Sequence, residues 1–191
     1  MQSSSIQNSP SLKPTSRLQQ LLPELFNPKP VSGEQFLRLQ LTSELTIAIA
    51  LSWVEETLLV DTQWVTPMPN MPPYTLGLMS SKSRVFWATD LIQLLKLPVE
   101  FTTSQNYEVV VIRALANDGQ PLQDEPLFLG LVVPKIRGAV RLTREEIVSP
   151  LNEVDENLQP YLSGQVFVDG ETVLILSAEA IGSAQPAATS G

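Results

Sequence analysis

The sequence has 191 residues, 43% of them hydrophobic, and its 12 basic and 20 acidic residues give a net charge of −8. Such a chain can bury a core, and its negative charge disfavours nucleic acid and anionic membrane surfaces as partners. It contains neither cysteine nor histidine, which excludes thiol nucleophiles, histidine-activated serines and the usual zinc and iron ligands.

The N-terminal segment differs in composition from the rest of the chain. Met1–Gly33 holds five of the sixteen prolines and many Ser and Gln residues, so we predict a disordered tail. Ser16 and Gln19 resemble a capping box, and four leucines share one helical face: Leu18, Leu21, Leu22 and Leu25. The segment is either a short partner-binding peptide or a stretch that folds back on the domain or stays mobile.

No targeting signal is recognisable in this sequence. Met1–Ser5 lacks a basic region leading into an apolar stretch, and no apolar run approaches the roughly 20 residues of a membrane helix. We therefore expect a cytoplasmic protein without direct membrane insertion.

From Glu34 onward the pattern changes to short strands. Apolar residues alternate from Phe36 to Ile49, and the run Leu127–Val133 is apolar on both faces, which predicts a central strand with Gly130 at a close approach. Asp169-Gly170 is a strong hairpin signal, and Asn117-Asp118-Gly119 predicts a longer connection.

Helices are expected to be few and short. Asp90 or Thr89 opens a helix over Leu91–Leu95, which Pro98 follows. Thr143 and Glu146 form a capping box that predicts a single helical turn over 143–148. Closely spaced strands with Gly and Pro between them indicate a mostly β fold of small antiparallel barrels.

One supersecondary unit is used twice. Pro72–Leu91 and Pro160–Ile181 each read as Tyr, two residues, Gly, a strand, a polar turn, a second strand and a polar residue that opens a short helix. The corresponding positions are Tyr74 and Tyr161, Gly77 and Gly164, and Asp90 and Ser177. We infer two related halves.

The order and spacing of several motifs resemble the CheW-like adaptor domain of bacterial chemosensory systems. The likeness extends from Glu34 to Gly182. The motifs that carry it are Glu34–Leu37, Pro67-Met68-Pro69 before Pro73–Leu78, Arg84–Leu91, Leu129–Val133, Arg141–Ile147 and Tyr161–Gly164. The Pro-rich tail and Val85-Phe86-Trp87 are similar to cyanobacterial members that serve phototaxis and pilus motility.

The resemblance implies two five-stranded barrels around a shared apolar core, over residues 34–182, with a disordered tail at 183–191. It implies a scaffold without enzymatic activity or cofactor that couples a chemoreceptor's cytoplasmic tip to a CheA-type histidine kinase. The protein would be a monomer alone and would assemble into arrays with its partners.

The candidate kinase-binding residues lie in the stretch 53–58, with Gly77 as a further candidate later in the sequence. The resemblance places Val54, Glu56 and Gly77 at partner-binding positions. Trp53, Val54 and Leu58 are apolar contact candidates, with a plain core role as the alternative for each. Trp64 and Trp87 are assigned to the core or to the barrel seam.

Candidate receptor-binding residues are Met79, Lys82, Arg84 and Val133, with a plain core role as the alternative for Met79 and Val133. Lys82 stands where the family usually has the Arg of an Asn-Leu-Arg-Gly motif; the sequence here is Ser80-Ser81-Lys82-Ser83. Lysine lacks the planar donor geometry of arginine, and Arg84 is the nearby residue that compensates. Pro134, where many members have Asp, predicts that the preceding strand ends at Val133.

A second function class remains open, namely a carboxylate-dependent hydrolase or ligand-binding barrel that uses Asp61 or Asp90. Asp61-Thr62-Gln63 resembles the Asp-Thr-Gly of aspartic proteases, but it lacks the glycine and a second copy. Asp90 discriminates between the classes, because a helix N-cap favours the adaptor and an open pocket shared with another carboxylate favours the enzyme. The acidic stretch from Glu145 to Glu156 is a solvated face or, alternatively, a site for a cation or a basic partner.

Overall fold

The computed structural model describes residues 32–98, 105–114, 127–149 and 154–184. Predictions for the tail before residue 32, for Asn117-Asp118-Gly119 and for residues 185–191 lie outside these ranges. Within them the chain is mostly β, as predicted, and forms ten strands. The strands are β1 Glu34–Gln40, β2 Thr46–Ala50, β3 Val54–Asp61, β4 Thr75–Ser81, β5 Arg84–Asp90, β6 Asn106–Ala114, β7 Leu127–Val133, β8 Lys135–Leu142, β9 Leu162–Val168 and β10 Glu171–Leu176.

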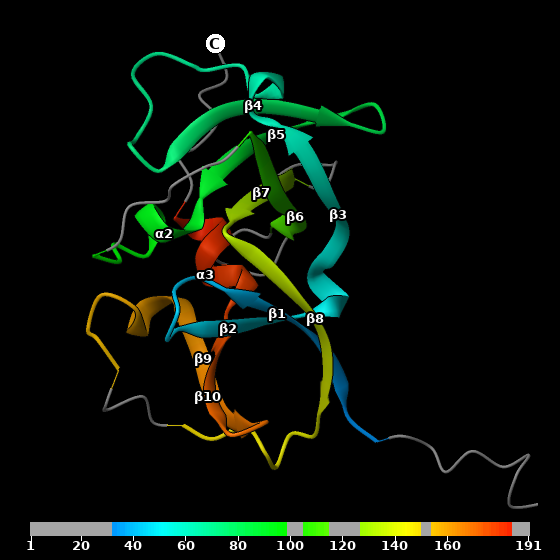
Figure 1. Cartoon of the computed structure of the whole chain (residues 1–191), viewed down its shortest axis with the longest axis vertical. Helices are drawn as coiled ribbons and strands as arrows, with labels where there is room; N and C mark the ends of the chain where they lie inside the picture. Colours follow the sequence, from blue (N-terminus) through cyan, green and yellow to red (C-terminus); the bar gives the residue numbers. More distant parts are fainter. Residues whose placement is uncertain (1–31, 99–104, 115–126, 150–153, 185–191) are drawn as a thin grey trace, which may run out of the picture. The chain divides into compact units, whose positions relative to one another are not determined.

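The ten strands form two five-stranded sheets with the same topology. Their orders are β8-β1-β2-β10-β9 and β3-β6-β7-β5-β4. In each sheet one inner pair is parallel, β2 with β10 and β5 with β7, and the other neighbours are antiparallel. The second sheet uses one continuous stretch of chain, whereas the first combines strands from both ends (Figure 1). The first sheet is therefore a circular permutation of the second.

Each sheet is open in the part of the chain that the structure describes, which corrects the expectation of closed barrels. The outer strands are β8 and β9 in the first sheet and β3 and β4 in the second. Single bridges add Thr66 to Leu78 on β4 and Val148 to Gln165 on β9. Each sheet thus has an equivalent short segment that pairs with its outer hairpin strand, β4 in one sheet and β9 in the other.

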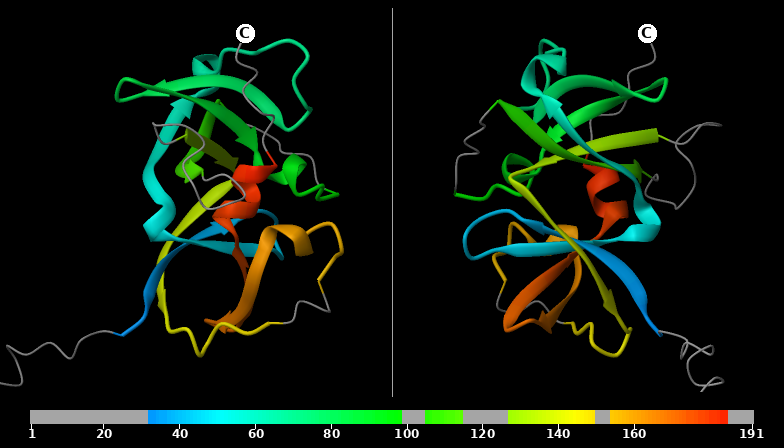
Figure 2. Two further views of the ribbon diagram at one scale, coloured as in Figure 1. Left: turned by 180° about the vertical axis from the view of Figure 1, so that it is seen from behind. Right: turned by 45° about the vertical axis from the view of Figure 1, so that its right-hand side comes forward.

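Three apolar clusters hold the fold together. The largest joins both sheets and the two α-helices, so the predicted shared core is present; it includes Leu39, Ile47, Ile112, Leu131, Leu91 and Ile181. Each sheet also has its own cluster on its other face, around Phe86 and Val109 in the second sheet and around Phe36 and Val173 in the first. Helix α3, Ala178–Ser183, lies between the sheets in both views of Figure 2.

The repeated unit has the same backbone geometry in both halves. The Asp90 N–H donates to the Tyr74 carbonyl at 2.8 Å, and the Ser177 N–H donates to the Tyr161 carbonyl at the same distance. Asp90 caps α2, Leu91–Leu94, and Ser177 caps α3. The hydroxyl of Tyr74 also donates to the Ala184 carbonyl at 2.9 Å, which ties the first unit to the end of the second.

Each copy of the repeat needs a glycine at the same place, Gly77 in the first and Gly164 in the second. Gly77 has a φ of +147°, and a Cβ there would overlap the carbonyl oxygen of Thr66. A Cβ at Gly164 would lie 2.7 Å from the side chain of Ile147 and 3.1 Å from the Val148 carbonyl oxygen. In both sheets the crossing segment lies directly on the glycine, and a larger residue would displace it.

Other local predictions have mixed outcomes. The Asp169-Gly170 turn, the strand end at Val133 and the close approach at Gly130, where a Cβ would lie 2.8 Å from the Phe86 ring, are confirmed. The helical turn over 143–148 is wrong. Glu146 does accept from the Thr143 N–H at 2.6 Å, but Val148 pairs with Gln165 and draws the chain into the sheet. No helix in the described ranges has the length and hydropathy needed to span a bilayer.

Candidate functional site

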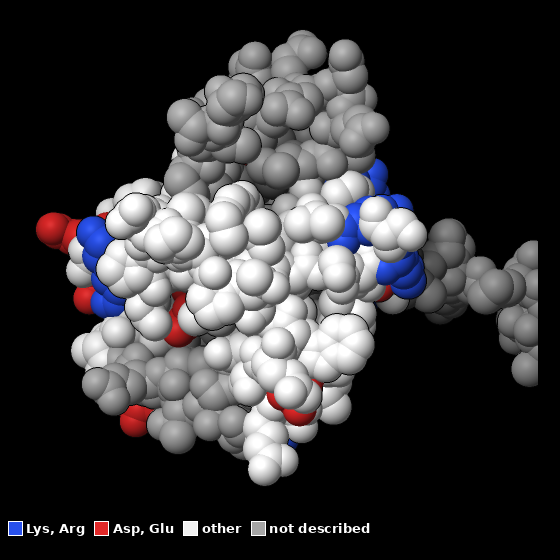
Figure 3. Space-filling view, turned by 90° about the horizontal axis from the view of Figure 1, so that it is seen from above, with Lys and Arg blue, Asp and Glu red and all other residues white. Residues whose placement is uncertain are grey.

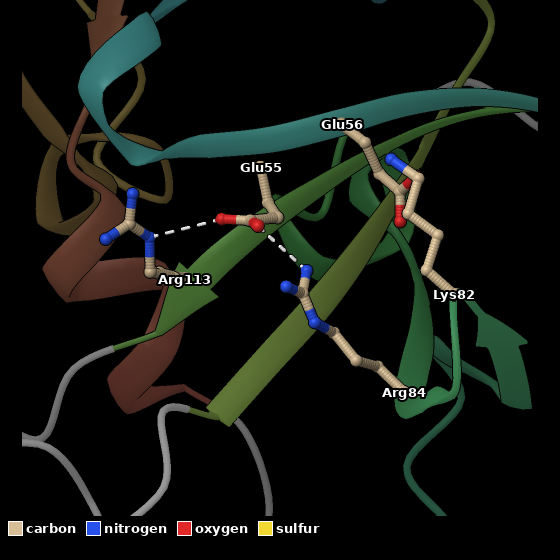
Figure 4. Close-up of polar contacts among 5 residues, drawn as sticks. All are labelled: Glu55, Glu56, Lys82, Arg84 and Arg113. Atoms are coloured by element: carbon tan, nitrogen blue, oxygen red, sulfur yellow. Dashed lines mark hydrogen bonds and ion pairs between the residues drawn. The ribbon is translucent and has the colours of Figure 1, made fainter.

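Two of the predicted site residues meet although the sequence assigned them to different partners. Lys82 Nζ lies 2.8 Å from Glu56 Oε2, and the Glu56 side chain is 8% exposed whereas that of Lys82 is 69% exposed (Figure 4). The hydrogen bond from Lys82 lowers the pKa of Glu56, burial opposes that change, and a hydrogen bond from Ser81 adds to it. The pair therefore fixes the tip of the β4–β5 hairpin to the beginning of β3.

The hairpin turn itself is strained. Lys82 and Ser83 have φ values of +49° and +64°, the geometry of a two-residue type I′ turn. The equivalent turn in the other sheet has Asp169 and Gly170, which adopt positive φ more readily than Lys and Ser. The surrounding contacts hold Lys82 in this conformation, and such strain is often found at functional positions.

Next to the pair of Glu56 and Lys82 lies a second group of charged side chains, centred on Glu55. Glu55 accepts from Arg84 Nη1 at 2.8 Å through Oε1 and lies 3.5 Å from Arg113 Nε through Oε2 (Figure 4). The Arg84 guanidinium lies over the Phe128 ring, 4.5 Å from its centroid, a distance typical of cation–π contacts. We call Glu55, Glu56, Lys82, Arg84 and Arg113 the hairpin charge cluster.

Sequence reasoning missed two members of this cluster, Glu55 and Arg113. Neighbouring residues on a regular strand face opposite sides, so Glu55 and Glu56 would be expected to point apart. A register shift between Val54 and Glu56 in the β3–β6 ladder alters this alternation. No signal in the sequence marks the bulge. Arg113 reaches the cluster only through the pairing of β6 with β3.

The apolar candidates differ in accessibility. Trp53, Val54 and Leu58 are partly buried and pack against core clusters, so each combines a core role with some accessible surface. Met79 is 3% exposed and Val133 is fully buried. Their side chains fill the interior of the fold, so the core role left open for both applies and the expectation of surface contacts is corrected.

The tryptophans require another correction. Trp64 was expected in the core or the seam, but it is 67% exposed. It lies in η2, Thr62–Trp64, a 3-10 turn that directly follows β3 and has no buried residue. Trp87 is partly buried against the shared core, as expected.

The two aspartates of the enzyme alternative are occupied in local caps. Asp61 accepts from the Gln63 N–H at 2.9 Å. Asp90 is 2% exposed and accepts from both the N–H and the side-chain amide of Gln93, at 3.1 and 3.0 Å. This is the N-cap arrangement that favours the adaptor. Among the described residues no three carboxylates gather as metal ligands would.

Two broader surface features accompany the cluster. A groove of about 320 Å³ lies where β1 begins and α3 starts, and its lining includes Trp53, Phe36, Ile147, Glu34 and Glu179. Seen from above, the side on which β4 lies in Figure 1, the described part of the molecule presents a mostly uncharged face with Lys, Arg, Asp and Glu mainly toward its edges (Figure 3). A partner at this face would therefore meet an uncharged surface with charged groups of both signs at its border.

The comparisons with known proteins agree with this architecture. The family model described as the CheW-like domain matches residues 35–185. The chain belongs to the CheW-like family. Among solved structures, this CheW-like chain is similar to the scaffolding protein TtCheW from Thermoanaerobacter tengcongensis, with a TM-score of 0.64 and 16% identity over 78% of this chain and 91% of that chain. Among curated proteins none matches it in sequence.

Proposed function

We propose that this CheW-like protein is a chemosensory scaffold that couples the cytoplasmic tip of a methyl-accepting-type receptor to a CheA-type histidine kinase. The observation that carries the proposal is the family match over 35–185, together with a fold of two topologically equal sheets around one core. TtCheW, which shares the fold, is described as a scaffolding protein. The signal would serve chemotaxis, phototaxis or pilus motility, and the protein would act in the cytoplasm.

The receptor contact is proposed at the hairpin charge cluster. Lys82 and Arg84 supply positive charge at the tip of a hairpin, and Lys82 is two-thirds exposed. Glu56 was a candidate for the kinase contact. We reassign it to the receptor contact, because it holds Lys82 in place. Charged groups of this kind give a contact its orientation and specificity more than its affinity.

The kinase contact is proposed at the apolar stretch Trp53, Val54 and Leu58, beside the groove that Trp53 lines. Partly buried aromatic and aliphatic groups at a rigid sheet edge are typical anchors of protein interfaces. Gly77 is proposed on the kinase side as well, and its lack of a side chain admits the crossing segment at Thr66.

The proposal is tested by asking whether the protein bridges two partners. A receptor-tip fragment and the CheA-type kinase of the same organism are mixed with and without the purified chain and separated by size-exclusion chromatography. We expect a ternary complex that forms only when the chain is present. Trp53→Ala should remove the kinase and Lys82→Glu the receptor, each leaving the other partner bound. Failure of the wild-type chain to bind either partner would overturn the proposal.

Within the residues that the structure describes, no geometry supports the hydrolase alternative. Asp61 and Asp90 lie in different caps, and each has its hydrogen bonds satisfied within its own turn. A retaining or inverting pair of carboxylates needs two acids facing one substrate across a pocket.

A further inference from the structure

Two arginines of the hairpin charge cluster share one carboxylate. Arg84 and Arg113 each approach a different oxygen of Glu55. Two positive charges and one negative charge leave this triad with a net charge of +1, on a chain whose net charge is −8. The neighbouring pair of Glu56 and Lys82 is neutral as a unit and does not balance the triad.

The two arginines are held differently. Arg84 makes a short bond to Glu55 and stacks on Phe128, so its position is fixed from two directions. Arg113 approaches Glu55 only through Nε, at 3.5 Å, which is longer than a well-formed charge-assisted hydrogen bond. Its side chain is 50% exposed, and within the described ranges it makes no other ion pair or hydrogen bond.

We infer that Arg113 is a further receptor-contact residue and that the group it takes is a carboxylate of the receptor. A guanidinium presents planar pairs of N–H donors that match the two oxygens of a carboxylate, and among the described residues those of Arg113 away from Nε have no partner. The incoming carboxylate would complete the charge balance of the triad while Glu55 keeps its bond to Arg84. This inference rests on the proposed function, because it names the chemistry of the same contact.

The receptor is favoured as the source of the carboxylate because Arg113 shares Glu55 with Arg84, a proposed receptor contact (Figure 4). The rest of the chain has an acid excess that repels acidic groups at long range. A partner carboxylate would therefore be guided to the local excess of positive charge, and binding should weaken as salt screens the attraction.

The test uses two substitutions with opposite expected effects. Arg113→Gln removes the receiving guanidinium and should weaken binding of the purified receptor-tip fragment roughly ten-fold, the usual scale for a charge-assisted hydrogen bond. Glu55→Gln removes the internal competitor, keeps the side-chain shape, and should strengthen binding. Arg144→Gln is the matched control, since it deletes the same charge from an exposed turn residue that makes no ion pair or hydrogen bond within the described ranges. Binding is measured by titration calorimetry at low and at raised salt.

The outcomes distinguish a failure of the inference about Arg113 from a failure of the proposed scaffold function. Opposite signs for Arg113→Gln and Glu55→Gln, both diminished at raised salt and neither seen with Arg144→Gln, support the inference. Equal losses from both cluster variants would show a merely structural triad and overturn it, as would unchanged affinity with normally folded variants. Altered kinase binding with unchanged receptor binding would also overturn it. If the wild-type chain does not bind the receptor fragment, the proposed function fails as well.

Discussion

Lys82 Nζ, at the tip of the β4–β5 hairpin, lies 2.8 Å from Oε2 of Glu56 at the start of β3. The two residues come from separate stretches of sequence and were assigned to separate partners, yet they form one unit. The carboxylate is almost fully buried and the ammonium is mostly exposed. A partner that binds Lys82 therefore also acts on the position of β3.

Exchanging the charges of this pair separates its structural role from its role in binding. Lys82→Glu places two carboxylates together and should lower the free energy of unfolding by about 1–2 kcal/mol, between the values for exposed and buried pairs. Glu56→Lys combined with Lys82→Glu restores an ion pair and should recover most of this stability. Receptor binding should remain weak in both, because the exposed charge is reversed. Urea unfolding and calorimetry check this, and recovery of receptor binding in the double variant would contradict the proposed contact.

The stability of the protein should depend on the ionisation of Glu56. Lys82 lowers the pKa of this group below its ordinary value of 4.5 in the folded protein. A carboxyl group whose pKa is lower in the folded protein than in the unfolded chain stabilises the fold. This stabilisation is fully present above the pKa of the unfolded chain and is lost as the pH falls through the pKa of the folded protein. The stability advantage of the wild type over Glu56→Gln should therefore be largest above about pH 5 and shrink below the ordinary carboxyl pKa.

Chemical unfolding of both proteins from neutral to acidic pH measures this difference. Glu156→Gln, which removes an exposed carboxylate that has no hydrogen-bond partner among the described residues, is the control and should show no comparable trend. A difference between wild type and Glu56→Gln that grows on acidification would have the wrong sign.

The two glycines of the repeat should respond unequally to the same substitution. Gly77→Ala forces a Cβ onto the Thr66 carbonyl at a φ of +147°, so two costs combine and we expect a loss of about 3 kcal/mol or more. Gly164→Ala meets chiefly the Ile147 side chain, which can shift, and should cost about 1–2 kcal/mol. Thermal unfolding monitored by circular dichroism measures both. Equal losses would mean that the two crossing segments are equally rigid. The size of the Gly77 effect also makes substitutions there unsuitable as probes of binding.

Tryptophan fluorescence should distinguish the exposed indole from the other two. Trp64→Phe should remove the emission that acrylamide quenches most readily and change the stability by no more than about 0.5 kcal/mol. Trp87→Ala should leave that emission in place and cost about 2–3 kcal/mol, because Trp87 packs against the shared core. Unchanged quenching in Trp64→Phe would mean that this indole is covered in solution.

Much of the architecture was accessible from local sequence signals. The repeat, the Asp-Gly turn, the caps at Asp90 and Ser177 and the strand end before Pro134 all depend on interactions within a few residues, so their residue types indicate them directly. The family resemblance implied two five-stranded barrels around a shared core, and the structure has two open five-stranded sheets around that core in the described ranges. The matching strand orders then required the structure, because circular permutation places equivalent strands at different points of the chain.

The candidate site was predicted only in part. Lys82, Arg84 and Glu56 were named, but their mutual contacts were not, and Glu55 and Arg113 were missed. Met79 and Val133 were expected near a groove and are core residues, and Trp64 was expected in the core and is exposed. For single apolar residues in strands, the sequence shows alternation without showing which face a neighbouring segment covers.

By itself the sequence determined the mostly β character, the repeated unit, the absence of cysteine and histidine chemistry and the family, because these follow from composition, local geometry and motif order. The tertiary structure alone decided the charge pairing. Lys82 reaches Glu56, and Arg84 and Arg113 reach Glu55, only after the bulge in β3 and the pairing of β3 with β6 bring strands from distant parts of the chain together. Such non-local pairings depend on strand order and register, and no short window of sequence contains that information.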